Sequence, residues 1–342
     1  KESYFINGNI GICNGALNSG IDIYYAYPMT PATPILSELA PVDGVKVIEL
    51  ENEIAVVNAG LGSAALGKNV MVGTSGGGFD LMTEGLSMAG VAEIPIVVYL
   101  AQRPGPGTGV ATYTSQGDLN MALNFGHGEF PRTVAAPGDP KEAQEITNEA
   151  FYLSQKFKIP SIILGDKHLA ESYYTLEEES SIKKVENTTQ LIRYNSYEKD
   201  NIGSATENAQ IIKANVDRRL RKTQEIKKEV EKFPRFSVYG ETDSMNVVVS
   251  WGSTKGAILD AIKDLDVEFL HVKYLEPFSD GIKENLLRKN IILVENSSTG
   301  QLAGVISKHT GMFIQDKNKI LRYDGRPFLA DELRKEIEKR LI

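Results

Sequence analysis

The sequence predicts an α/β protein, in which a doubly wound parallel-sheet domain is followed by a smaller α/β domain. Short β-branched segments alternate with helical segments along residues 1–175 and again along 244–342. The run IPIVVYL at 94–100 is continuously apolar, which is typical of a strand buried on both faces of a sheet. Most of the 31 glycines precede residue 166, so we expect the close backbone approaches of a functional site in the first domain.

In the first domain, apolar spacing predicts each element in turn. Residues 16–25 are expected to close a helix onto a short strand. Further strands are expected over 46–50, 70–73, 94–100 and 161–164, and helices over 35–40, 54–66, 81–90 and 140–157. Strands and helices that alternate in this way form parallel sheets, which bind ligands at the carboxyl ends of their strands.

Residues 176–243 are predicted to form a charged connector, in which acidic and basic side chains alternate at helical spacing. Because acids interrupt every basic cluster there, a solvated helix face is expected and not a nucleic-acid-binding patch. A second alternation begins at Asn246 and predicts the small domain over 244–342. Its strands are expected over 246–252, 267–275 and 291–296, and its helices over 254–262 and 331–341.

Composition excludes several classes of protein. A net charge of −8 argues against a broad nucleic-acid-binding face, because phosphate neutralisation needs clustered Lys and Arg. Cys13 is the single cysteine, so this chain alone cannot form a disulfide or hold a metal centre wholly through cysteines. No segment approaches the roughly 18 apolar residues of a membrane helix, and the first residues lack the apolar run of a signal peptide. We expect a cytoplasmic protein with no membrane or nucleic-acid partner.

A P-loop-like segment is misleading, and His127 has two alternative interpretations. Residues 62–69 nearly match a phosphate-binding P-loop, but Asn69 stands where a hydroxyl should bind Mg2+, and the segment closes a helix where a P-loop would open one. The four histidines form no metal-binding pattern, and no nucleophile elbow is present, so a metal site and hydrolysis are not expected. His127, in a Gly-His-Gly loop, stays open as a ligand contact or part of a surface turn.

Four loops at predicted strand ends carry the chemistry. In the first, prolines stiffen residues 27–34 and hold the hydroxyl of Thr30, although a plain helix entry would have the same composition. The second places Glu49, Glu51 and Glu53 where a strand passes into a helix, and any one of them can simply favour the helix dipole.

The third loop, TSGGGF at 74–79, has three glycines that expose backbone N–H groups before a helix, as in an anion-binding cradle. The fourth, 102–109, follows the buried strand and contains Arg103, whose guanidinium can bind a carboxylate at two points. Gln116-Gly117-Asp118 comes soon afterwards. Because the carboxyl ends of parallel strands meet at one edge of a sheet, these loops are expected to converge.

In order and spacing, the loops resemble the α subunit of the 2-oxoacid:ferredoxin oxidoreductases, in particular the 2-oxoglutarate-type and broad-specificity archaeal forms. The second domain, with WGS at 251–253 and YLEPF at 274–278, resembles the transketolase C-terminal domain of these subunits. Gly77, Asp80 and Met29 depart from the proline, serine and isoleucine usual there, which bears on substrate preference more than on function. The matching motifs of the first domain are Gly8-Asn9, Tyr27-Pro28-x-Thr30-Pro31, Glu51-x-Glu53-Ile54, Thr74-Ser75-Gly76-x-Gly78-Phe79, Leu81-Met82-x-Glu84-Gly85, Glu93-x-Pro95, Gln102-Arg103, Gln116-Gly117-Asp118 and Gly126-His127-Gly128.

The resemblance implies a thiamine diphosphate pyrimidine-binding domain that shares its cofactor with a separate β subunit, on which Mg2+ and a 4Fe–4S cluster are expected. Glu53 matches the family's catalytic glutamate, which would hydrogen-bond N1′ of the aminopyrimidine and so promote removal of the thiazolium C2 proton. This task needs a buried carboxyl that keeps or shares a proton, and Glu51 is the fallback. The matching motifs also assign Thr74, Ser75, Gly76, Gly78 and Phe79 to the cofactor, and Tyr27, Pro28, Thr30 and Arg103 to the substrate.

The implied reaction is oxidative decarboxylation of a 2-oxoacid to CO2 and an acyl-CoA, with electrons passing through the β subunit to ferredoxin. Coenzyme A and a γ-type domain or subunit are further expected partners. The substrate stays open between 2-oxoglutarate, pyruvate and branched 2-oxoacids. A stand-alone thiamine-dependent enzyme would need a GDG…N diphosphate motif, which this sequence lacks, and a non-catalytic assembly subunit would not need Glu53, Thr30 and Arg103 together.

Overall fold

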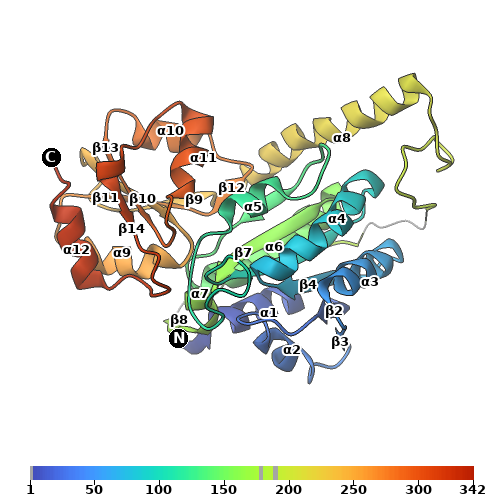
Figure 1. Cartoon of the computed structure of the whole chain (residues 1–342), viewed down its shortest axis with the longest axis horizontal. Coiled ribbons are helices and arrows are strands. Elements are labelled where there is room, and N and C mark those ends of the chain that lie inside the picture. Colours follow the sequence, from blue (N-terminus) through green and yellow to red (C-terminus); the bar gives the residue numbers. More distant parts are fainter. Residues whose placement is uncertain (1–2, 177–179, 188–191) are drawn as a thin grey trace.

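Two largely parallel sheets, each covered by helices on both faces, and a small two-stranded sheet make up the computed structural model (Figure 1). The structure describes residues 3–176, 180–187 and 192–342, so parts of the predicted connector, 177–179 and 188–191, lie outside the described residues. The predicted α/β fold class is confirmed. None of the helices in the described part of the chain combines the length and the apolar character that a membrane span requires.

The first sheet has seven strands in the order β12-β6-β7-β5-β4-β2-β3. All neighbours pair in parallel except β12, which pairs antiparallel with β6. Every residue of β4, β5 and β7 is buried, as the continuous apolar run at 94–100 predicts for β5. The strands are β2 (Ile23–Ala26), β3 (Lys46–Glu49), β4 (Val70–Thr74), β5 (Ile96–Gln102), β6 (Thr133–Ala135), β7 (Pro160–Asp166) and β12 (Tyr274–Glu276).

Alternate side chains of these strands face two separate cores, because successive residues of a strand point to opposite faces. Val72 and Val98 pack with α3 (Glu53–Ala65), α4 (Gly76–Ala92) and α5 (Leu119–Asn124). Met71 and Val97 pack on the other face with α1 (Gly8–Asn18), α2 (Pro34–Leu39) and α6 (Pro140–Phe157). A short helix α7 (Lys167–Glu171) follows β7, and β1 (Tyr4–Asn7) pairs with β8 (Tyr173–Leu176) in a separate two-stranded sheet.

The second sheet has five strands in the order β14-β13-β10-β11-β9, of which only β9 is antiparallel to its neighbour. Val248 and Ile292 pack against α9 and α12, whereas Val247 and Val249 pack on the opposite face with α10 and α11. The elements are β9 (Phe236–Gly240), β10 (Asn246–Trp251), η1 (Gly252–Thr254), α9 (Lys255–Ala261), β11 (Glu268–Val272), α10 (Gly281–Leu286), β13 (Asn290–Glu295), α11 (Gln301–Thr310), η2 (Asp316–Asn318), β14 (Lys319–Leu321) and α12 (Ala330–Glu338).

The connector contains the predicted charged helix as α8 (Ala209–Val230), which runs from the first domain towards the second in Figure 1. Two details of the connector and second domain were not expected. β9 lies inside 176–243 and forms an edge of the second sheet, and the single strand predicted over 267–275 is two strands, β11 and β12. The second of these crosses to the first sheet, so a segment assigned to the second domain completes the sheet of the first.

The boundaries of α3 and α4 test two further predictions. The P-loop-like segment 62–69 lies at the end of α3, as its helical pattern predicts. A phosphate loop would precede a helix, so this segment is not a phosphate loop. Helix α4 begins at Gly76, five residues before the predicted start, so the glycines are the first turn of the helix and not a loop that precedes it. Ser75 is the N-cap residue of α4 and has an extended backbone, but its side chain makes no capping hydrogen bond.

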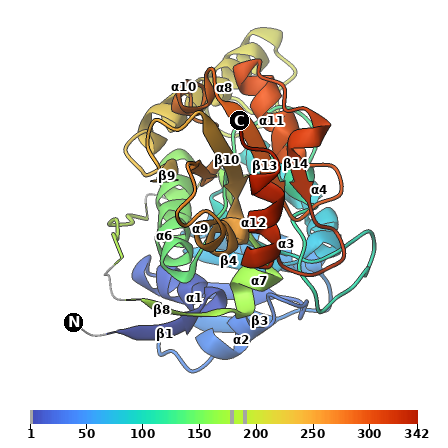
Figure 2. The ribbon, with the colours of Figure 1, turned by 90° about the vertical axis from the view of Figure 1, so that its left-hand side faces the viewer.

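Hydrogen bonds and a buried charge cluster join the two domains. The side chain of Gln116 donates to Trp251 O at 2.8 Å and accepts from Asn296 N at 2.8 Å. Lys255 of the second domain forms ion pairs with Asp139 and Glu142 at the start of α6, and Lys273 reaches Glu142 at 3.0 Å. Figure 2 looks from the second domain towards the first, with the orange and red elements of the second domain in front. The second domain is thus fixed against the carboxyl edge of the first sheet, where Gln116 and Asp166 lie.

Candidate functional site

The four chemistry-bearing loops converge at the carboxyl ends of β2, β3, β4 and β5, as predicted. These strands are neighbours in the sheet, in the order β5-β4-β2-β3, and all run in parallel. Their loops therefore leave the sheet at the same edge.

Glu53 is the first residue of α3 and is the most deeply buried of the three clustered glutamates, with 3% of its surface exposed. The side chain of Asn52 caps the helix by accepting from Ala55 N at 2.9 Å, so the helix start does not depend on Glu53. Within the described residues, Glu53 Oε1 is buried and has no hydrogen-bond partner. Because a buried carboxyl oxygen without a partner is costly, this atom is available to a ligand.

The first turn of α4 packs directly on this carboxyl. A Cβ atom at Gly78 would clash with both Thr74 Oγ1 and Glu53 Oε1, so only glycine fits there. Ser75, the N-cap residue of α4, is fully buried, and its Oγ has no hydrogen-bond partner in the described part of the chain. Thr74, Ser75, Gly78 and Glu53 therefore lie together, with two buried polar atoms left unsatisfied.

The first and fourth loops also meet. Arg103 Nη1 donates to Thr30 O at 2.9 Å, which joins the loop after β5 to the loop after β2. Thr74 Oγ1 lies 3.9 Å from Met29 Sδ, which brings the end of β4 to the same loop. Arg103 and Thr30 are both partly exposed residues at this edge of the sheet.

The side chains of other predicted site residues make no hydrogen bond or ion pair with this centre within the described residues. Tyr27 is 40% exposed, Pro28 is half-buried and Glu51 is exposed, and no hydrogen bond or ion pair within the described residues joins them to Glu53 or Arg103. Phe79 is fully buried and meets the ring of Phe125 edge to face at 5.3 Å, so its side chain packs in the core. His127 is exposed, and its backbone N donates to Ser87 Oγ at 3.0 Å.

Asp118 is a candidate that the sequence analysis noted only as part of a motif. A Cβ at Gly76 would lie 2.8 Å from Asp118 Oδ2, so this carboxyl packs on the first turn of α4. Its Oδ2 is buried without a hydrogen-bond partner among the described residues, and burial together with the nearby Asp80 raises the pKa of Asp118 to about 6. The Gln116-Gly117-Asp118 motif after a buried strand was the available signal, but the sequence does not show that it folds back onto Gly76.

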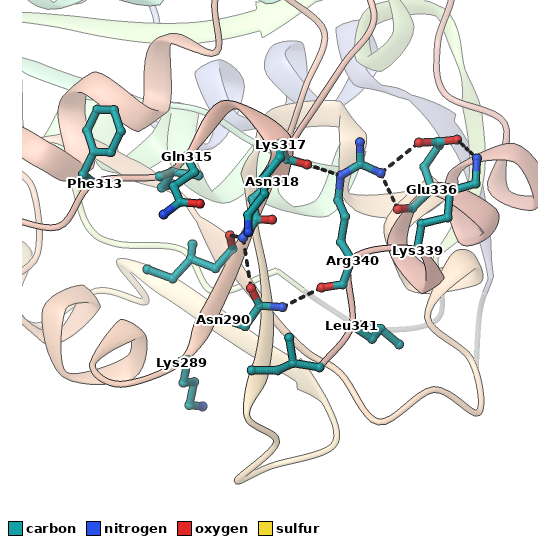
Figure 3. A pocket seen from close by; sticks show the side chains of 13 residues that line it. Lys289, Asn290, Phe313, Gln315, Lys317, Asn318, Glu336, Lys339, Arg340 and Leu341 are labelled. Atoms are coloured by element: carbon teal, nitrogen blue, oxygen red, sulfur yellow. Dashed lines mark hydrogen bonds and ion pairs between the residues drawn. The ribbon is translucent and has the colours of Figure 1, made fainter.

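A cavity of about 640 Å³ lies far from this centre, in the second domain, at the amino ends of β13 and β14 (Figure 3). Its polar side chains bond one another: Asn318 Nδ2 donates to Asn290 Oδ1 at 2.9 Å, and Asn290 Nδ2 donates to Arg340 O at 2.7 Å. Arg340 in turn donates to Glu336 Oε2 at 2.8 Å. These bonds hold the end of the chain against β13, so the cavity is a structural junction and not the centre of the chemistry.

The sequence and the fold of the chain are similar to those of known proteins. Residues 14–234 match the family model described as pyruvate flavodoxin/ferredoxin oxidoreductase, thiamine diP-binding. The chain is similar to the 2-oxoacid:ferredoxin oxidoreductase subunit alpha of Saccharolobus solfataricus, with 33% identity over 99% of this chain and 62% of that protein. The chain thus spans about three fifths of the length of this curated relative.

Two solved structures have a similar fold. A 2-oxoglutarate:ferredoxin oxidoreductase from Magnetococcus marinus, with 2-oxoglutarate, coenzyme A and succinyl-CoA bound, superposes with a TM-score of 0.89 and 25% identity, over 99% of this chain and 65% of that one. A split-gene transketolase superposes with a TM-score of 0.57 and 13% identity, over 98% of this chain and 96% of that one, which is a likeness of fold alone.

Proposed function

Because the chain belongs to the pyruvate flavodoxin/ferredoxin oxidoreductase family with its thiamine diphosphate-binding domain, we propose that it is the α subunit of a 2-oxoacid:ferredoxin oxidoreductase. The reaction is oxidative decarboxylation of a 2-oxoacid to CO2 and an acyl-CoA, and electrons pass to ferredoxin through a separate iron–sulfur β subunit. One observation carries the proposal above all: the buried Glu53 Oε1 that has no partner within the described chain, at the edge where four strand-end loops meet.

The residues present fit the aminopyrimidine half of thiamine diphosphate. That ring presents a nitrogen to a carboxyl group, and Glu53 supplies a carboxyl oxygen that is shielded from water and otherwise unsatisfied. When bound, thiamine diphosphate supplies the electron sink for loss of CO2 from a 2-oxoacid. The diphosphate, Mg2+ and a 4Fe–4S cluster are proposed to be held by the β subunit.

Glu53 has the central role in this chain. Its carboxyl group is proposed to hydrogen-bond the ring nitrogen and to hold or share a proton at Oε1 during catalysis. Burial serves this role in two ways, because it excludes competing water and strengthens each hydrogen bond in the low local dielectric. Gly78 keeps the carboxyl in place, since any side chain there would displace it.

Arg103 and Thr30 are proposed to bind the carboxylate of the substrate. The hydrogen bond from Arg103 Nη1 to Thr30 O orients the guanidinium and leaves further N–H groups for an anion. Part of the pocket that distinguishes one 2-oxoacid from another is proposed to lie on the β subunit. A γ-type domain or subunit is a further proposed partner.

Reconstitution tests the proposal directly. The chain is combined with the β subunit that co-purifies with it, together with thiamine diphosphate, Mg2+ and coenzyme A, and methyl viologen reduction is followed with 2-oxoglutarate, pyruvate and branched 2-oxoacids. We expect reduction that depends on both the 2-oxoacid and coenzyme A. Absence of a β-type partner, or absence of reduction with every 2-oxoacid in its presence, contradicts the assignment.

A further inference from the structure

A second, smaller cavity lies on the opposite edge of the first sheet from Glu53. It has a volume of about 280 Å³ and is lined by residues of α5, the loop that follows it, α8 and β12, elements that lie close together in Figure 1. Arg132, which lines it, directly precedes β6, so the cavity is at the amino end of that strand. Glu53, Thr74 and Arg103 lie at carboxyl ends of parallel strands, so the cavity is separate from the proposed catalytic site.

Arg132 is held rigidly in the wall of this cavity. Its guanidinium lies over the rings of Phe125 and Phe130, 4.2 Å from each ring centre, and Nη1 donates to Phe125 O. Burial lowers the pKa of Arg132 to about 10, which still leaves the group charged at neutral pH. A guanidinium has five N–H donors in a fixed plane, so the group can bind a further acceptor without moving.

Glu276, the last residue of β12, faces the same cavity. Across residues 3–176, 180–187 and 192–342, no hydrogen bond or ion pair engages its carboxyl group, although the charges of Lys308, Arg132 and Lys227 act on it. Burial outweighs these three cations and raises the pKa of Glu276. A desolvated carboxyl group and a desolvated guanidinium therefore line one cavity without pairing with each other.

The remaining walls include apolar side chains, among them Leu123, Ile226 and Pro277. The volume is below the range of roughly 300–1,000 Å³ that holds drug-sized ligands, so the cavity suits a small metabolite. Arg132 and Glu276 are the charged residues that line it, so the cavity suits a ligand that carries both an anionic group and a hydrogen-bond donor. We propose that this cavity binds a small carboxylic acid with a polar group next to its carboxylate, Arg132 binding the carboxylate and Glu276 the neighbouring polar group.

The proposal does not depend on the assigned catalytic activity. Two sources share this ligand chemistry, namely 2-hydroxy acids and α-amino acids, whose hydroxyl or ammonium group can donate to Glu276. Isothermal titration of the full chain with lactate and alanine distinguishes them, and propionate, lactamide, alaninamide and pyruvate, whose oxo group cannot donate, are the controls. We expect at least one of the two acids to bind, and its amide or its unsubstituted analogue to bind at least tenfold more weakly.

Variants and hydrogen–deuterium exchange locate the site. Arg132→Lys and the isosteric Glu276→Gln should each weaken binding tenfold or more, and the ligand should protect segments 123–132 and 274–277 from exchange. Asp280→Asn is the matched control, because it makes the same acid-to-amide change four residues on, at an exposed carboxylate that pairs with Lys227. Arg103→Ala should leave this binding unchanged.

Three results overturn the proposal. They are no binding of any acid at millimolar concentration, equal binding of the acid and its amide, or binding that Arg103→Ala abolishes while Glu276→Gln retains it. The last result would assign the ligand to the proposed substrate site. The methyl viologen assay tests the proposed 2-oxoacid oxidation separately, so failure of that proposal can be told apart from failure of this one.

Discussion

At the scale of single residues, burial separates glutamates that the sequence presents as equivalent. Glu49, Glu51 and Glu53 are spaced two apart, but only Glu53 lies inside the protein, where its Oε1 has no partner in the described chain. An exposed carboxylate is solvated and costs nothing, whereas a buried one persists only if function or structure requires it. Asn52 already caps α3, so Glu53 is not needed to cap this helix.

Glu53→Gln should therefore reduce 2-oxoacid oxidation by the assembled enzyme at least about 100-fold, because loss of a positioned acid–base group costs that much. The near-isosteric amide keeps the volume, so the thermal unfolding transition should move little. Glu51→Gln, at the exposed neighbour, is the matched control and should stay near wild-type activity. Full activity in Glu53→Gln together with its loss in Glu51→Gln would transfer the role to Glu51.

Arg103→Ala should raise the KM for the 2-oxoacid about tenfold or more, because a hydrogen bond to a charged group contributes about 1.5–3 kcal/mol. Steady-state kinetics over a range of substrate concentrations measures this change. Arg103→Lys keeps the charge but not the planar donor set, so it should recover the KM only in part. A KM unchanged in Arg103→Ala would remove Arg103 from substrate binding.

At the scale of elements, the first turn of α4 shows how one residue position decides a site. Gly76, Gly77 and Gly78 are adjacent in a single helical turn, yet a Cβ at each would meet different neighbours: Asp118 at Gly76, only Gly107 O at 4.0 Å at Gly77, and Thr74 with Glu53 at Gly78. The glycine run thus lets the helix start approach two carboxyl groups. The cost is a low intrinsic helix propensity at three successive positions.

Gly78→Ala should lower the free energy of unfolding by about 1–3 kcal/mol and also impair activity, because the added methyl displaces the Glu53 carboxyl. Gly77→Ala makes the same change one residue away, where the nearest atom is 4.0 Å from the new Cβ. It should leave activity intact and leave stability unchanged or higher by up to about 1 kcal/mol. Equal effects of the two substitutions, measured by urea unfolding and by viologen reduction, would contradict the packing described here.

At the scale of the whole molecule, buried charges fasten the second domain to the first. Glu142 of α6 pairs with Lys255 and Lys273. Lys255 directly follows η1, and Lys273 directly precedes β12. Burial alone would raise the pKa of Glu142, but the neighbouring His271 and the positive charges of Lys255 and Lys273 lower it to about 2. Breaking such a buried pair leaves an uncompensated charge inside the protein.

Glu142→Gln should therefore lower the free energy of unfolding at pH 7 by about 3–5 kcal/mol. The carboxyl group titrates near 4.5 in the unfolded chain and near 2 in the folded one, so its contribution is complete above pH 4.5 and is lost as the pH falls towards 2. The stability difference between wild type and variant should shrink over that range in urea titrations. A difference that does not change with pH would show that the carboxylate charge is not what stabilises the junction.

The sequence by itself determined the alternation of strands and helices, the charged helix of the connector and the four loops that carry the chemistry. These features depend on local periodicity and on residues close in the chain, which a sequence displays directly. The sequence at 267–275, VEFLHVKYL, could not show that one strand divides between two sheets, because it contains no glycine, proline or other turn residue to mark the division. Local sequence patterns likewise did not predict that β9 forms an edge of the second sheet.

Only the tertiary structure decided which glutamate is buried, that the glycines belong to α4, and that Asp118 returns to Gly76. Each of these depends on contacts between segments that are far apart in the chain, such as Glu53 with Gly78 or Arg103 with Thr30. Burial, and with it the energy of a charge or an unpaired oxygen, is a property of all the atoms that surround a group. The sequence therefore supplied the chemical groups of the site, and the folded chain alone selected the ones that water cannot reach.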